Sequence, residues 1–164
     1  MMVAMTKRIT REMTYEAPLA QVAAMLRDTS FRDAVCERQH VLLHTVDVRA
    51  EGDAAEVRIT REQRVERVPA FAAKFVGESI TIETREAWTD LGSGAYSIGI
   101  PGKPGQIEGT VNLREQDGVT TETVELTVSV PVPLLGAKLE GVVAELLEAA
   151  LRTEHEVGVA YLAG

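Results

Sequence analysis

The 164-residue sequence predicts a single α+β domain in which an antiparallel sheet packs against one long C-terminal helix. Residues 134–162 contain no proline and carry an apolar stripe at intervals of three and four, which is typical of an amphipathic helix. Most of the preceding sequence alternates apolar and polar residues, which is the period of half-buried strands. At about 1.5 Å per residue the helix is roughly 43 Å long and needs a broad apolar partner. We expect the strands to form that partner.

The N-terminal segment predicts one strand followed by two short helices. Residues 6–15 alternate as a strand does, and Pro18 suits the first position of a helix of about three turns. Ser30, with Asp33 three residues later, resembles a capping box and predicts a second helix that extends to about His40. We expect residues 1–5 to be disordered or an extension from an upstream start.

A period of two after Val41 predicts six further strands. These strands cover residues 42–48, 57–65, 80–88, 96–100, 107–113 and 124–130. Turn sequences at 51–53, 101–105 and 116–118 separate several of them, and we expect a loop over residues 68–76. The predicted order is therefore strand, helix, helix, six strands and a long helix.

Composition and charge exclude several classes of partner. The formal net charge is −8, and neither Lys nor Arg forms a contiguous run, so we expect no nucleic-acid partner. No segment approaches about 18 consecutive apolar residues, so we expect no membrane span. Cys36 is the single cysteine and no secretory leader is recognisable, which favours a cytoplasmic protein. The excess of Arg over Lys is typical of GC-rich bacterial genomes, and the oligomeric state stays open.

Three segments resemble the helix-grip fold of the START-like superfamily, also called SRPBCC. They are Tyr15-Glu16-Ala17-Pro18 at the end of the first strand, Trp88 at the end of a central strand, and Pro131-Val132-Pro133-Leu134-Leu135-Gly136 before the last helix. The resemblance covers nearly the whole chain and is greatest to uncharacterised bacterial members. This superfamily includes lipid-transfer domains, polyketide cyclases and aromatases, and pollen-allergen-like ligand carriers. The resemblance implies one domain over residues 1–164, with a seven-stranded sheet wrapped around the last helix and an apolar cavity between them.

We expect this cavity to bind or carry a small hydrophobic molecule that is lipid-like or polyketide-like. The expected apolar lining comes from the inward faces of the strands and the helix, namely Met13, Val46, Val48, Val57, Ile59, Ile80, Ile82, Tyr96, Ile98, Leu139, Val143, Leu146 and Leu147. Phe71 and Phe75, in the expected loop, are candidates for a lid over the cavity. The alternative is that both rings fill the core beneath a one-turn helix. We expect no cofactor and no metal.

Arg61, Gln63 and Glu86 are candidate polar anchors, because each shares the parity of the inward apolar residues. If Ile59 lies near Glu86, then Arg61 is diagonal to Glu86 and the two side chains can orient a polar group of the ligand. The alternative is that they face solvent at frayed strand ends, or form a structural ion pair.

An enzyme is the less favoured hypothesis, since the sequence contains no nucleophile elbow, phosphate-binding glycine loop or HExxH motif. A cyclase, aromatase or hydratase would use Glu86 and His44 as acid and base groups in the cavity. A third hypothesis is a protein-interaction module without an open pocket. Cys36 and His40 alone do not make a zinc site, and His155 is expected on the solvated side of the last helix.

Overall fold

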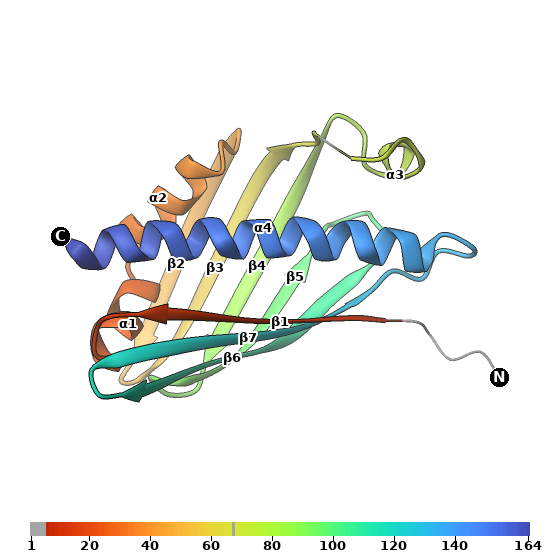
Figure 1. Ribbon diagram of the computed structural model, residues 1–164. Coiled ribbons are helices and arrows are strands. Elements are labelled where there is room, and N and C mark those ends of the chain that lie inside the picture. Colours follow the sequence, from red (N-terminus) through yellow and green to blue (C-terminus); the bar gives the residue numbers. More distant parts are fainter. Residues whose placement is uncertain (1–5, 67) are drawn as a thin grey trace.

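The computed structural model describes residues 6–66 and 68–164, so the expectation for residues 1–5 lies outside the described residues. The elements follow the predicted order with one additional helix (Figure 1). In chain order they are β1 (Lys7–Tyr15), α1 (Leu19–Leu26), α2 (Thr29–Arg38), β2 (Leu43–Glu51), β3 (Ala54–Arg64), α3 (Ala70–Val76), β4 (Ser79–Trp88), β5 (Ser93–Gly99), β6 (Gln106–Gln116), β7 (Val119–Ser129) and α4 (Gly136–Ala163).

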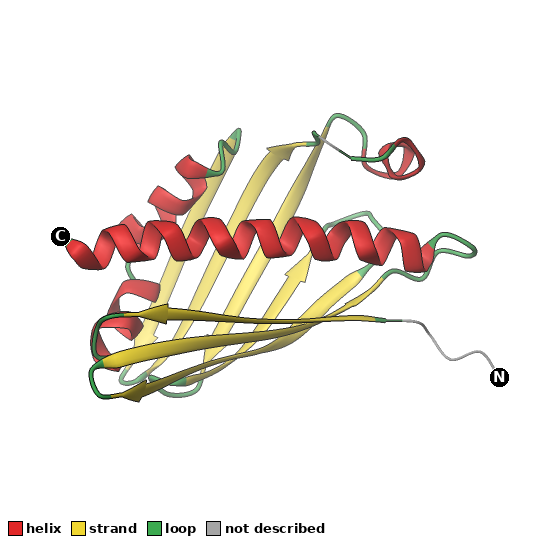
Figure 2. Cartoon of the chain, in the orientation of Figure 1, coloured by secondary structure: helices red, strands yellow, loops and turns green. Residues whose placement is uncertain are grey.

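All seven strands form one antiparallel sheet with the order β1-β7-β6-β5-β4-β3-β2. The first two strands in the sequence therefore lie at opposite edges of the sheet, and α1 and α2 connect them. The long helix α4 crosses one face of the curved sheet, while α1 and α2 lie at one end of it (Figure 2). This arrangement is the helix-grip fold, so the predicted fold class is confirmed. None of the described helices has both the length and the apolar composition that a membrane span needs.

Two local predictions are wrong. The expected loop over residues 68–76 contains the short helix α3, which begins after Pro69, a residue whose fixed φ suits a helix start. The expected capping box at Ser30 is replaced by a cap two residues earlier. The Asp28 carboxylate accepts a hydrogen bond from the backbone N–H of Ser30 at 2.9 Å, so α2 begins at Thr29.

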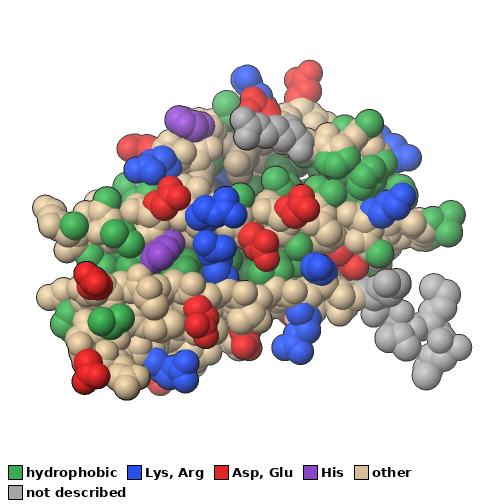
Figure 3. Space-filling view, in the orientation of Figure 1, with side chains coloured by type: hydrophobic (Ala, Val, Ile, Leu, Met, Phe, Trp, Pro, Cys, Tyr) green, Lys and Arg blue, Asp and Glu red, His purple; other side chains and the backbone are tan. Residues whose placement is uncertain are grey.

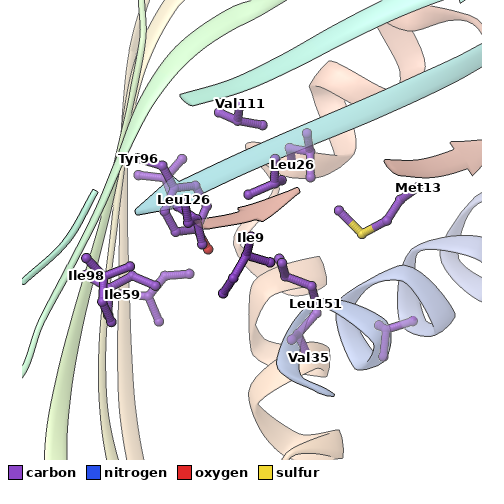
Figure 4. Packing of buried hydrophobic residues seen from close by; sticks show 14 of the residues in the cluster. Ile9, Met13, Leu26, Val35, Ile59, Tyr96, Ile98, Val111, Leu126 and Leu151 are labelled. Atoms are coloured by element: carbon purple, nitrogen blue, oxygen red, sulfur yellow. The ribbon is translucent and has the colours of Figure 1, made fainter. Parts of the chain in front are cut away.

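The core is tightly packed at the end of the sheet where α1 and α2 lie. Met13, Val22 and Phe31 are fully buried there. A Cβ added to Gly158 of α4 would lie only 2.8 Å from Cε1 of Tyr15, so the absence of a side chain lets α4 approach β1 closely. Further along the sheet, Ile59 and Ile98 face Leu151 of α4 (Figure 4). The packing is less complete beyond that point, toward α3.

Candidate functional site

A cavity of about 390 Å³ lies between the sheet and the N-terminal half of α4. Its sheet wall includes Ile82 of β4 and Ile98 of β5, and its helix wall includes Leu139, Val143 and Leu147 of α4. The molecular surface is hollowed between α3 and α4, where hydrophobic side chains gather (Figure 3). The volume is at the lower end of the range of about 300–1,000 Å³ that is typical of small-molecule sites. The cavity is therefore large enough for a small organic ligand.

Many of the residues predicted from the sequence line this cavity. They are Arg61, Gln63, Ile80, Ile82, Ile98, Leu139, Val143, Leu146 and Leu147, together with Phe75 of α3. Phe71 does not contribute to the wall; its ring instead lies 5.9 Å from Nζ of Lys138 on α4. The two phenylalanines thus have different positions, and only Phe75 adjoins the cavity.

Other predicted residues lie outside the cavity. Met13 and Val57 are fully buried in the packed end of the core, where α1 and α2 fill the space between sheet and helix. Val46 and Val48 lie on the edge strand β2 and are only partly buried against that core. All four are on the predicted face of the sheet, but Met13 and Val57 lie in the packed end, and Val46 and Val48 lie at the edge of the sheet. Their assignment to the cavity lining was therefore wrong.

A smaller and more polar pocket of about 40 Å³ adjoins the large cavity. The two share Gln39, Arg61, Ile98, Leu147 and Ala150 in their walls. The smaller pocket is also lined by predicted residues Ile59 and Tyr96, and by residues that the sequence did not indicate, namely Arg32, Cys36 and Glu154. Its volume exceeds the roughly 10–15 Å³ that one water molecule requires. The apolar cavity therefore has a polar inner end.

Arg61 occupies the boundary between the two spaces. Its Nη1 donates to Oε1 of Gln39 at 2.6 Å, and its Nη2 lies 3.4 Å from Oγ1 of Thr84. Its Nε is shielded from solvent and has no hydrogen-bond partner among the described residues. No carboxylate of the described chain lies within 4.0 Å of this guanidinium. Arg61 thus carries a charge whose hydrogen-bond partners are neutral.

Glu86 does not pair with Arg61, which corrects the expected diagonal contact. The strand register places Ile59 opposite Thr84 and Arg61 opposite Ile82, so Glu86 lies further along β4, opposite Val57. The carboxylate of Glu86 instead accepts hydrogen bonds from Nη2 of Arg32 at 2.9 Å and from Nε1 of Trp88 at 3.0 Å. Glu86 is only 2% exposed and does not line the cavity, so it is a structural partner of Arg32.

Arg32 and Glu154 complete a buried ion network that the sequence analysis missed. Arg32 donates through Nη1 to Glu154 at 3.3 Å and through Nε to the backbone oxygen of Leu26 at 2.8 Å. Burial disfavours the charged guanidinium, but Glu86 and Glu154 raise the pKa of Arg32 overall. One feature of the sequence indicates that Glu154 is buried: it lies three residues from both Leu151 and Val157, on the apolar stripe of α4.

Another buried acid, Glu122 of β7, has no arginine partner among the described residues. The Tyr15 hydroxyl lies 3.5 Å from its Oε1. Burial raises the pKa of Glu122 well above its usual value, and the nearby charges of Glu154 and Glu86 add to this effect. Burial likewise raises the pKa of Glu154. The interior therefore keeps Glu122 protonated to higher pH than an exposed glutamate.

The histidines lie away from the cavity. Nε2 of His44 is 3.0 Å from the Asp33 carboxylate, and His44 lines neither space. His155 is half-buried, so the expectation that it is solvated is met only in part: its Nε2 lies 2.8 Å from the backbone oxygen of Thr14 and its ring contacts Tyr15 edge-on at 5.1 Å. Cys36 lines the inner pocket, and burial raises the pKa of its thiol.

Comparison with family models gives one match, over residues 10–162, to a family described as a protein of unknown function (DUF2505). The chain belongs to this family. No curated protein matches the sequence. The family match covers nearly all of the sheet and of α4 and every residue that lines the two spaces, so the site described above lies within the shared domain.

Solved structures with the same fold share little sequence with this DUF2505 protein. TTHA0849 from Thermus thermophilus has a TM-score of 0.61 and 19% identity, with 94% of this chain and 99% of that chain covered. A START superfamily protein from Mycobacterium smegmatis has a TM-score of 0.59 and 14% identity, with 94% and 98% covered. The di-domain ARO/CYC StfQ from the steffimycin biosynthetic pathway has a TM-score of 0.66 and 12% identity, with 94% and 50% covered. These similarities establish the START-like fold.

Proposed function

We propose that this protein binds and carries a small hydrophobic molecule in the cavity between the sheet and α4. The observation that carries the proposal is the cavity of about 390 Å³ with walls of isoleucine, leucine and valine. An unfilled apolar cavity loses dispersion contacts that close packing would supply, so its presence lowers stability. A bound apolar molecule would restore those contacts and be removed from water at the same time.

The two alternative functions have less support. Enzymes named ARO/CYC occur among the structures with this fold, but a likeness of fold alone does not transfer an activity. The two residues considered as acid and base both have partners outside the cavity, since Glu86 pairs with Arg32 and His44 pairs with Asp33. A protein-interaction module does not need the large apolar cavity. The carrier hypothesis assigns a role to the large apolar cavity, which is the main feature of the site.

Titration with Nile red, a neutral dye that fluoresces in apolar surroundings, tests this proposal. We expect saturable binding of one dye per chain, and competition by the neutral amphiphile 1-dodecanol. Purified protein that neither enhances the dye fluorescence nor binds 1-dodecanol by calorimetry would count against the proposed function. Neutral compounds are chosen so that the result depends on the apolar cavity and not on a charged side chain.

A further inference from the structure

We infer that the ligand is an amphiphile with a single carboxylate, which pairs with Arg61 at the inner end of the cavity while the apolar tail extends toward α3. This inference rests on the proposed function, because it names the chemical class of the molecule that occupies the same cavity. It depends on three features: the partners of Arg61, the engagement of Arg32, and the distribution of polar groups along the cavity.

The first feature is that no carboxylate of the described residues contacts the charged guanidinium of Arg61. A guanidinium stays protonated in proteins, and burying a charge beside apolar walls is costly unless an opposite charge compensates it. Here Nη1 and Nη2 contact the neutral oxygens of Gln39 and Thr84, and Nε has no partner among the described residues. Arg61 therefore retains donor capacity for an anionic group. A planar guanidinium matches the geometry of a carboxylate, which it binds through two parallel hydrogen bonds.

The second feature limits the charge of the ligand. Arg32 is the other guanidinium in the inner pocket, and all three of its nitrogens are engaged by Glu86, Glu154 and the Leu26 carbonyl. Among the described residues that line the inner pocket, Arg61 is thus the one cation left for the ligand. A carboxylate would be balanced by Arg61 alone, whereas a phosphate dianion would bring a second negative charge, for which the described part of the inner pocket offers no further free cation. A hydroxyl would form a hydrogen bond but leave the charge of Arg61 uncompensated.

Glu154 is the carboxylate of the inner pocket that would repel a bound anion. Its surroundings include Arg32 of α2, Arg61 of β3, Glu86 of β4 and Tyr96 of β5. Burial raises the pKa of Glu154, which favours the neutral form that accommodates an anion. The environment of this acid is therefore compatible with a carboxylate at Arg61.

The third feature gives the ligand its orientation. The walls beyond Arg61 are largely apolar and include Ile82 and Ile98, and the other charged lining groups among the described residues, Arg64, Glu66 and Lys103, are exposed. A head group held by Arg64 or Lys103 would remain hydrated and screened, so it would gain little from the pairing. A carboxylate at Arg61 is desolvated, and its tail covers the apolar wall.

Isothermal titration calorimetry at pH 7.5 with dodecanoate, 1-dodecanol and dodecyl phosphate tests the inference. We expect dodecanoate to bind at least about tenfold more tightly than either other compound, because a charge-assisted hydrogen bond is stronger than a neutral one. Equal affinities for dodecanoate and 1-dodecanol, or tightest binding of dodecyl phosphate, would overturn the carboxylate assignment and leave the proposed function standing. Failure of all three to bind would overturn both.

Substitutions then test the position of the head group. Arg61→Gln removes the charge, and we expect it to abolish the preference for dodecanoate over 1-dodecanol, while Arg61→Lys keeps the charge and part of the preference. Lys103→Gln and Arg64→Gln are matched controls that remove one charge at the exposed part of the cavity, and both should keep the preference. Loss of the preference in a control, with its retention in Arg61→Gln, would place the head group at the exposed end and refute the inference. The ratio of affinities within each variant is insensitive to a general loss of stability.

Discussion

Replacing Val143 with phenylalanine should make the ligand-free protein more stable and should lower its affinity for the ligand. Val143 is half-buried on α4 and lines the cavity of about 390 Å³, so the larger ring has unfilled space to enter. Cavity-filling substitutions commonly contribute about 0.5–2 kcal/mol to the free energy of unfolding. For a domain of this size each kcal/mol raises Tm by about 2–4 °C. The ring would also occupy volume that a ligand needs.

Differential scanning calorimetry and Nile red titration measure the two effects on the same samples. Val159→Phe is the matched control, because Val159 lies on the same helix, is 49% exposed and does not line the cavity. We expect Val143→Phe to increase Tm and to weaken dye binding by at least about tenfold, and Val159→Phe to do neither. A Val143→Phe protein that binds the dye as the wild type does would refute the assignment of the site. A marked decrease in Tm for this variant would show that the cavity cannot accommodate the larger ring.

Three further substitutions test the packed end of the structure. Arg32→Met leaves two buried carboxylates without their cation, so urea denaturation should show a loss of about 3–5 kcal/mol; a loss below about 1 kcal/mol would disprove the network. Glu122→Gln tests the raised pKa of Glu122. Above pH 4.5 the native state keeps the carboxyl proton of Glu122 while the unfolded state releases it, so the stability of the wild type falls as pH rises from 4.5 toward the raised pKa. The free energy of unfolding of Glu122→Gln relative to wild type should therefore increase with pH in that window, by at most about 1.4 kcal/mol per pH unit, and a difference independent of pH would exclude the shift. Gly158→Ala places a Cβ 2.8 Å from Cε1 of Tyr15, so thermal unfolding should show a loss of about 1–3 kcal/mol, and an unchanged Tm would contradict the close approach.

All the elements except α3 could be predicted from the sequence, because each of them follows from a local pattern. The stripe over residues 134–162 corresponds to α4 at Gly136–Ala163, since an unbroken amphipathic period defines a helix without knowledge of its partner. Alternation likewise identified the inward face of each strand. It did not give the position along the helix axis, so Val57 was grouped with Ile98 although only Ile98 lines the cavity.

The charged interior could not be predicted in the same way, because its contacts join distant parts of the chain. Arg32 and Glu154 are separated by 122 residues, and nothing in the sequence near either residue identifies the other. The partner of Glu86 depended on the register of β3 and β4, which places Arg61 opposite Ile82. A shift in register changes which side chains meet, and sequence alternation alone does not determine it.

Native mass spectrometry of the protein expressed in and purified from its natural source, followed by denaturing extraction, tests directly whether the cavity carries a ligand. We predict a noncovalent adduct on the wild-type protein that is released on denaturation as a hydrophobic monocarboxylate, and a much smaller amount of that adduct on Val143→Phe. A ligand-free mass for the wild type, or the same adduct in equal amount on both proteins, would contradict a carrier function located in this cavity.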